Sequence, residues 1–294
     1  MRYGVCAAAM GVLAVGHAMA QDQPPKLSLM QDYESVYAPP EPERTSEGVN
    51  EGGVHFDLEV RYMTDYVYRG VERFDDVGAH EDSPNYQIDG LLSWDLGKLP
   101  HPFVGVFVNV YDSDPISNFQ EIRPYLGFDW NLRPFLLTAG HNSYLFPDRD
   151  SMETTEIYGQ IKLDDSYFLK TDKPVLSPYI YGAYDYDLYN GWYFEAGVSH
   201  DFPIEDWGIV IRAEAQIAYV HANEYFTARD DEESGFQHYQ VGLIGQYSLN
   251  TLLNVSQRYG EWHVIGYLYY TDGIDNDLLA DTQVWGGAGI GFRY

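Results

Sequence analysis

Apolar and polar residues alternate along most of the chain after residue 54. Successive side chains of a β-strand point to opposite faces, so a period of two predicts strands with one apolar and one polar face. We expect the first strand to span residues 55–69. Its polar face carries five charged residues: Asp57, Glu59, Arg61, Asp65 and Arg69.

Eleven further runs show the same alternation. They cover residues 86–96, 103–111, 121–130, 135–144, 153–163, 178–186, 193–202, 209–220, 238–249, 262–271 and 283–294. Each is roughly nine to fourteen residues long, which lets a tilted strand cross the hydrocarbon core of a membrane. A total of twelve is even and places both chain ends on one side, as single-chain bacterial barrels require. The predicted fold is an all-β transmembrane barrel of about twelve antiparallel up-and-down strands; ten or fourteen strands are the alternatives.

The last run, residues 283–294, has the features of a barrel-closing strand. Phe292 and Tyr294 share its apolar face, and Trp285 lies on the opposite, glycine-rich face. An amphipathic last strand with a terminal aromatic residue is typical of bacterial outer-membrane barrels, in which no unpaired strand edge can face lipid. We expect this strand to engage the machinery that assembles such barrels.

The first 53 residues have a different composition. Residues 1–20 combine Arg2, an apolar stretch and a small-residue ending at Ala20, which predicts a secretory signal peptide. Cys6, the one cysteine, lies within this segment, so neither a disulfide nor a thiolate metal site is expected after cleavage. Residues 21–53 are rich in Pro, Glu, Gln and Gly and predict a disordered periplasmic leader. The barrel domain is expected to cover residues 54–294.

Charge and hydropathy narrow the possible environments and partners. The net charge of −28 argues against nucleic acid, whose phosphates require basic partners, and favours cations. Mean hydropathy is only −0.35 although 45% of residues are hydrophobic, as expected when apolar residues are spread by alternation. A soluble β-sandwich or lipocalin-like barrel also alternates. Long strands, with Tyr and Trp near their ends, favour the membrane barrel instead.

Charged residues on the polar strand faces are expected to point into the lumen. Arg123, Arg212 and Glu214 join the five charges of the first strand in this set. Asp65 and Arg69 are predicted to form an ion-pair network with Glu59 and Arg61. Such charges either line a pore or hold one another in a structural network.

The segment Thr64-Asp65-Tyr66-Val67-Tyr68-Arg69-Gly70-Val71 resembles the S-D-Y-x-F-R-G-x-S opening of the TorF-type porins of Gram-negative bacteria. Thr and Tyr here replace the usual Ser and Phe, and residues 72–74 depart from the Ser-containing continuation. The likeness otherwise consists of chain length, signal and strand rhythm. It implies an outer-membrane porin reached by secretion across the inner membrane. Gly70 is suited to the turn that ends this segment.

Two features suggest other chemistry. His141 and Ser143 share one strand face, so the imidazole could activate the hydroxyl as in outer-membrane phospholipases, with Glu153 or Glu156 as supporting acid. Acidic loops could bind Ca²⁺ or Mg²⁺, although none has EF-hand spacing. The loop candidates are Asp230, Asp231, Glu232, Asp275 and Asp277. An electronegative rim without bound metal is the favoured interpretation, and no cofactor is expected.

These observations favour a porin-like channel for passive diffusion of small hydrophilic solutes, with an acidic mouth that prefers cations. Its expected partners are outer-membrane lipid, lipopolysaccharide and the assembly machinery. Two alternatives stay open: a non-conducting structural or adhesive barrel, if bulky side chains fill the lumen, and a lipid hydrolase based on His141 and Ser143. An enzyme is the less favoured of these.

Overall fold

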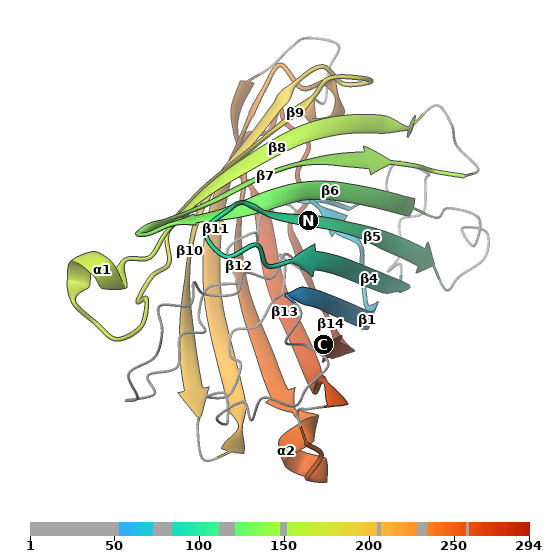
Figure 1. Ribbon diagram of the computed structural model, residues 1–294. Coiled ribbons are helices and arrows are strands. Elements are labelled where there is room, and N and C mark those ends of the chain that lie inside the picture. The colour runs from blue at the N-terminus through green and yellow to red at the C-terminus, as the bar shows by residue number, and fades with distance from the viewer. Residues whose placement is uncertain are drawn as a thin grey trace.

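The computed structural model describes residues 53–72, 84–111, 121–147, 152–204, 207–227, 234–256 and 259–294. The predicted signal peptide and all of the predicted leader except its last residue lie outside these ranges. Twelve antiparallel strands form a closed barrel (Figure 1), each paired with its neighbours in sequence, and the last strand returns to the first. The wall strands are β1 (Val54–Met63), β4 (Asn85–Trp94), β5 (His101–Tyr111), β6 (Glu121–Leu132), β7 (Phe135–Tyr144), β8 (Thr154–Leu163), β9 (Tyr179–Asp185), β10 (Trp192–Ile204), β11 (Ile209–His221), β12 (Ser234–Ser248), β13 (Glu261–Gly273) and β14 (Gln283–Arg293). The predicted fold class and strand number are confirmed.

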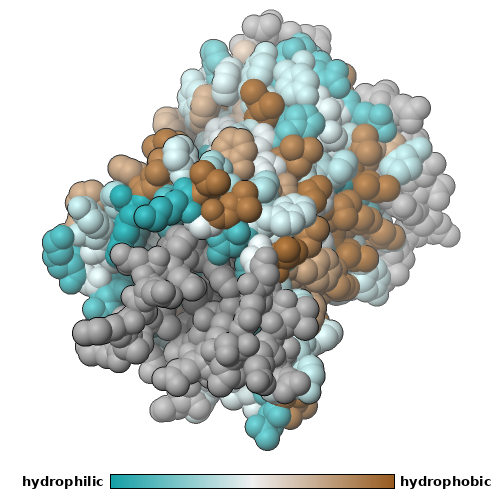
Figure 2. Space-filling view, in the orientation of Figure 1, coloured by the Kyte–Doolittle hydropathy of each residue, from teal (hydrophilic) through white to brown (hydrophobic). Residues whose placement is uncertain are grey.

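The barrel is apolar outside and polar inside. Outward residues such as Ile180 and Val284 are 64% and 65% exposed, whereas inward residues such as Asn85 and Glu121 are fully buried. Figure 2 shows apolar side chains gathered over the strand wall that faces the viewer. A soluble sandwich or lipocalin-like barrel buries its apolar face, so this distribution excludes the soluble alternative. The chain is a transmembrane β-barrel.

The seam between β1 and β14 closes the barrel without a free edge. Their register pairs Asp57 with Arg293, and the backbone of Tyr294 exchanges hydrogen bonds of 2.8 and 2.9 Å with Phe56. Glycines make this seam narrow: a Cβ on Gly289 would lie 2.8 Å from the Cβ of Arg61. The small inward face of β14 therefore leaves room for the large side chains of its neighbours.

The first strand is shorter than predicted. β1 ends at Met63, and the chain then leaves the wall and forms a two-stranded hairpin of β2 (Val67–Tyr68) and β3 (Val71–Glu72). The prediction of one strand through Arg69 was therefore wrong. The alternation continues past Met63 because hairpin residues also alternate, but they contact the interior of the barrel instead of a neighbouring wall strand.

Within the described ranges, the structure gives bounds for three short helical segments in connections between wall strands. They are α1 (Ser166–Leu169), the 3-10 helix η7 (Glu224–Phe226) and α2 (Leu249–Leu253). α1 and α2 follow β8 and β12 and project from the barrel (Figure 1), at the end that also carries the start of β1 and the end of β14. No helix among the described residues has the length and apolar character needed to cross a membrane.

Candidate functional site in the barrel lumen

The hairpin of β2 and β3, which we call the lumenal hairpin (residues 64–72), is the centre of the site. Arg69 and Gly70 form its two-residue turn, with φ angles of 51° and 80°. Two successive positive φ values are those of a type I′ turn, whose twist matches a two-stranded ribbon. A left-handed conformation costs a residue such as Arg69 on the order of 1 kcal/mol, so its surroundings must hold it in place.

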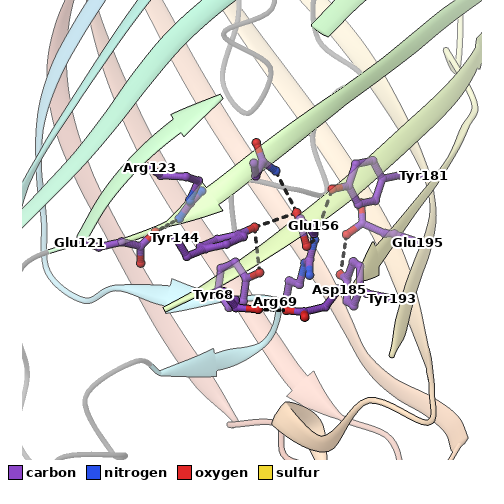
Figure 3. A network of polar contacts seen from close by, with 12 residues as sticks. Tyr68, Arg69, Glu121, Arg123, Tyr144, Glu156, Tyr181, Asp185, Tyr193 and Glu195 are labelled. Carbon is purple, nitrogen blue, oxygen red and sulfur yellow. Dashed lines mark hydrogen bonds and ion pairs between the residues drawn. The ribbon is translucent and has the colours of Figure 1, made fainter. Parts of the chain in front are cut away.

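Arg69 forms a buried ion pair with Glu156 of β8 (Figure 3). Its Nη2 lies 3.1 Å from Oε1 and 3.0 Å from Oε2 of that carboxylate. Asn142 and Tyr144 of β7 donate further hydrogen bonds to the same Oε1, at 2.8 and 2.7 Å. The carboxylate thus receives donors from the hairpin and from the wall, and it ties the tip of the hairpin to β7 and β8.

Aromatic rings surround the Arg69 guanidinium. Its Cζ lies 4.3 Å from the ring centre of Tyr193 and 5.1 Å from that of Tyr68, within the range of cation–π attraction. Nη2 also donates a 3.2 Å hydrogen bond to the hydroxyl of Tyr181. Burial disfavours the charged guanidinium, but attraction by Glu156 and nearby tyrosines outweighs it, and the pKa of Arg69 lies well above its ordinary value. Arg69 therefore stays charged inside the lumen.

A second ion pair, between Arg123 and Glu121 of β6, lies beside the first. Tyr66 of the lumenal hairpin donates a 2.9 Å hydrogen bond to Glu121 and accepts one of 2.7 Å from Arg123. The hydroxyl of Tyr68 donates to that of Tyr144 at 3.1 Å, which links the two ion pairs through the hairpin. Alternate residues of the hairpin thus reach different strands of the wall.

The turn of the hairpin is also held on the opposite side of the barrel. Gln237 of β12 donates a 3.0 Å hydrogen bond to the carbonyl of Arg69, and the backbone N–H of Asp281 donates one of 2.8 Å to the carbonyl of Gly70. The α-carbon of Gly70 packs against the ring of His238, where a Cβ would lie 2.5 Å from Cγ. The lumenal hairpin therefore spans the interior from β7 and β8 to β12.

The structure brings only part of the predicted charge network together. Arg61 pairs with Glu59 at 3.1 Å, as the sequence predicts for neighbours on one strand face. Asp65 and Arg69 are not on that strand, and Arg69 pairs with Glu156, which is 87 residues away in sequence. The prediction that Arg69 lies on the first strand beside these charges was therefore wrong. The hairpin carries Arg69 across the lumen, whereas Glu59 stays on the wall.

The remaining predicted lumen charges all face the barrel interior. Asp57 lies 3.5 Å from Arg293, and Arg212 pairs with Asp201 at 2.8 Å. Glu214 lies between inward Arg212 and inward Gln216 on β11 and shares their parity. Their inward placement follows the alternation of the strands, but the identity of each partner depends on register between strands.

The aromatic residues of the closing strand lie on both of its faces. Trp285 points inward, is 3% exposed and stacks on Tyr269 with ring centres 4.4 Å apart. Phe292 lies on the outer face, 4.5 Å from Trp262 and 6.3 Å from Tyr294 between ring centres. These positions agree with the two parities expected from the sequence.

The hydrolase candidate lies on the outer face of β7. The imidazole Nε2 of His141 lies 2.7 Å from the hydroxyl of Tyr186. Glu156, one of the two acids considered for this site, points to the opposite face of the wall and binds Arg69. An acid on the other side of the sheet cannot orient His141, so the expected pairing with Glu156 was wrong.

The acidic loop candidates fall in two groups. Asp230, Asp231 and Glu232 lie outside the described residues. Asp275 and Asp277 are close neighbours, and Asp275 accepts a 3.1 Å hydrogen bond from the backbone N–H of Asp277. Within the described ranges, no three His, Cys, Asp or Glu residues converge as a metal site requires.

Several residues of the site were not assigned to the lumen from the sequence. Glu121, Glu156 and Glu195 all lie on inward strand positions, and each binds a hairpin residue or an adjacent tyrosine. Alternation alone would have placed them in the lumen. The partners of Glu121 and Glu156 could not be foreseen because the hairpin was taken as part of β1.

Comparisons with known proteins identify no family: neither a family model nor a curated protein matches the chain. Among solved structures, the chain is similar to the porin NanC, with 12% identity, a TM-score of 0.46, and coverage of 81% of this chain and 98% of NanC. An outer-membrane channel from Pseudomonas putida F1 gives 8% identity, a TM-score of 0.44, and coverage of 86% and 100%. The translocator domain of the autotransporter NalP from Neisseria meningitidis gives 12% identity, a TM-score of 0.38, and coverage of 84% of this chain and 90% of that domain. The resemblance of residues 64–71 to TorF-type porins stays a prediction.

Proposed function

We propose that the protein is an outer-membrane channel that passes small hydrophilic solutes, preferably cations, through a lumen narrowed by the lumenal hairpin. The observation that supports it is the inverted distribution of polarity: the outer wall is apolar, while charged and polar side chains line the inside. Polar and charged side chains on the inside of the wall are what a water-filled passage for hydrophilic solutes requires.

The net charge of −28 and the acidic outer connections support a cation preference. A negative mouth concentrates cations and repels anions over roughly the Debye length of about 8 Å at physiological salt. Localisation in a Gram-negative outer membrane, contacts with its lipids and lipopolysaccharide, and insertion through the barrel-assembly machinery follow from the same proposal.

The hairpin narrows the proposed passage. Arg69 and the tyrosines around it occupy the interior between β8 and β12, so a solute must pass beside them or displace them. We therefore expect a small conductance, below that of an unobstructed barrel of twelve strands.

Single-channel recording in planar bilayers tests this proposal. The refolded protein should give discrete steps, and the reversal potential in a salt gradient should have the sign of a cation-selective pore. Neutralising Arg61 or Arg69 should change the step size if these residues line the passage. A silent bilayer from correctly folded protein would overturn the channel proposal.

The second candidate function is a non-conducting structural or adhesive barrel. The observation that favours it is the aromatic packing around the hairpin, in which Tyr66, Tyr144 and Tyr193 are each at most 2% exposed. If this packing is permanent, ions do not pass. Absence of conductance steps from protein that unfolds cooperatively at high temperature, and is therefore folded, would favour this function over the channel.

A further inference from the structure

Glu214 of β11 differs from the other carboxylates inside the barrel. Both of its carboxylate oxygens are buried and have no hydrogen-bond partner, and it is the one carboxylate of the described residues with such oxygens. By contrast, Asp129 accepts a hydrogen bond from Thr138, and Glu195 from Tyr193. A buried carboxylate without a donor is costly, so its position implies a donor that enters from the lumen.

The side chain of Gln240 on β12 is unpartnered in the same way. It is 1% exposed, and neither its amide nitrogen nor its amide oxygen forms a hydrogen bond. The register places Gln240 opposite Gln216 and Glu214 opposite Gly242, so the two unpartnered side chains occupy successive inward levels of adjacent strands. Asn109 of β5 also has an unpartnered amide, but it lies five strands away from β12 around the barrel.

An aromatic surface adjoins Glu214. A Cβ placed on Gly242 would lie 3.1 Å from Cγ of Glu214 and 2.5 Å from Cε1 of Tyr269, so both side chains lie over this glycine. Tyr269 in turn stacks on Trp285. Gly242 thus lets an acid and an aromatic ring approach each other, and together they place a carboxylate beside an aromatic side chain.

The chemistry of this group favours an organic cation over a metal ion. Divalent metals require several oxygen ligands, and no three acidic or histidine residues converge within the described ranges. Arg212, the inward cation two residues along the strand, is bound to Asp201 through two hydrogen bonds of 2.8 and 3.1 Å. An ammonium group supplies the N–H donors that Glu214 and Gln240 lack, and its charge suits the adjacent ring.

We propose that Glu214 and Gln240, with Tyr269 beside them, form a lumenal binding site for small organic cations that carry an ammonium group. This proposal rests on the proposed function, because it identifies the class of solute that the channel passes. It lies on the β11–β12 wall, whose strands are three and four positions around the barrel from β8, the strand that carries Glu156.

Equilibrium binding tests the site without requiring conduction. The probes are methylammonium chloride, which has three N–H donors, and tetramethylammonium chloride, which has the same charge and none. Line broadening of the probe's NMR signal is titrated with refolded protein in detergent micelles. We expect saturable binding of methylammonium, weakened at least about tenfold in Glu214→Gln and more mildly in Gln240→Ala. Asp129→Asn removes one lumen charge elsewhere and serves as the matched control.

The outcomes separate the site from the channel. Equal methylammonium binding by wild type and Glu214→Gln would overturn the site, as would equal weakening by Asp129→Asn or equal affinity for tetramethylammonium. If the protein conducts but methylammonium binding does not depend on Glu214, the channel proposal stands and the site proposal fails. If the bilayer is silent but binding depends on Glu214, the channel proposal fails and the site proposal stands. Absence of methylammonium binding in wild type would also overturn it.

Discussion

Replacing Glu156 by Gln removes the charge that holds the tip of the lumenal hairpin. In wild type the carboxylate accepts hydrogen bonds from Arg69, Asn142 and Tyr144. An amide offers one acceptor oxygen and turns an NH₂ group toward the remaining donors, while Arg69 stays charged and buried. Breaking a buried ion pair in this way costs about 3–5 kcal/mol. At 1.4 kcal/mol for each factor of ten, the docked hairpin loses about two to three and a half powers of ten in population.

We expect Glu156→Gln to give larger and more variable single-channel steps than wild type and a lower unfolding temperature. The control is Asp129→Asn, because Asp129 binds Thr138 of the wall and no hairpin residue. The double variant Arg69→Met, Glu156→Gln removes both charges, so its stability should lie closer to wild type than that of Glu156→Gln alone. Identical conductance and unfolding temperature in wild type and Glu156→Gln would refute the reasoning.

Two further predictions test the turn and the membrane face. Gly70→Ala should lower the free energy of unfolding by about 1–3 kcal/mol, because φ at this position is 80° and the new Cβ meets the His238 ring. The control is Gly97→Ala, which should cost less because φ is 70° there but no atom lies within 4 Å of the new Cβ. Chemical denaturation compares the two variants, and equal losses of stability would contradict docking of the turn. Ile290→Lys should impair folding into lipid vesicles by about 2–4 kcal/mol, because Ile290 is 51% exposed on the outer face of β14. Leu99→Lys, in a turn, should be tolerated, and equal tolerance of the two changes would argue against a lipid-facing wall.

Alternation was sufficient to locate the wall of the barrel. Twelve strands were predicted and twelve form the barrel, because every wall strand separates lipid from lumen and so keeps a period of two. The parity of Asp57, Glu59 and Arg61 was correct for the same reason, and all three are buried inside.

The lumenal hairpin could not be distinguished from β1 by alternation. Tyr66 and Tyr68 continue the period of two, yet both are buried, at 2% and 4% exposure, because the hairpin lies inside the barrel. The Arg69-Gly70 pair was a usable signal, since a residue followed by Gly is suited to a two-residue hairpin turn. Contacts such as Arg69 with Glu156 depend on how the segment folds back, which no local pattern contains.

Removal of the lumenal hairpin tests the central claim most directly. Residues 65–72 are replaced by a short Gly-Ser linker, and single-channel conductance is recorded for this variant and for wild type in the same bilayers. We predict small, cation-selective steps for wild type and clearly larger steps for the variant, because Arg69 and its tyrosine neighbours no longer narrow the lumen. Equal steps would show that the hairpin does not limit the passage, and silence of both folded proteins would contradict the channel itself.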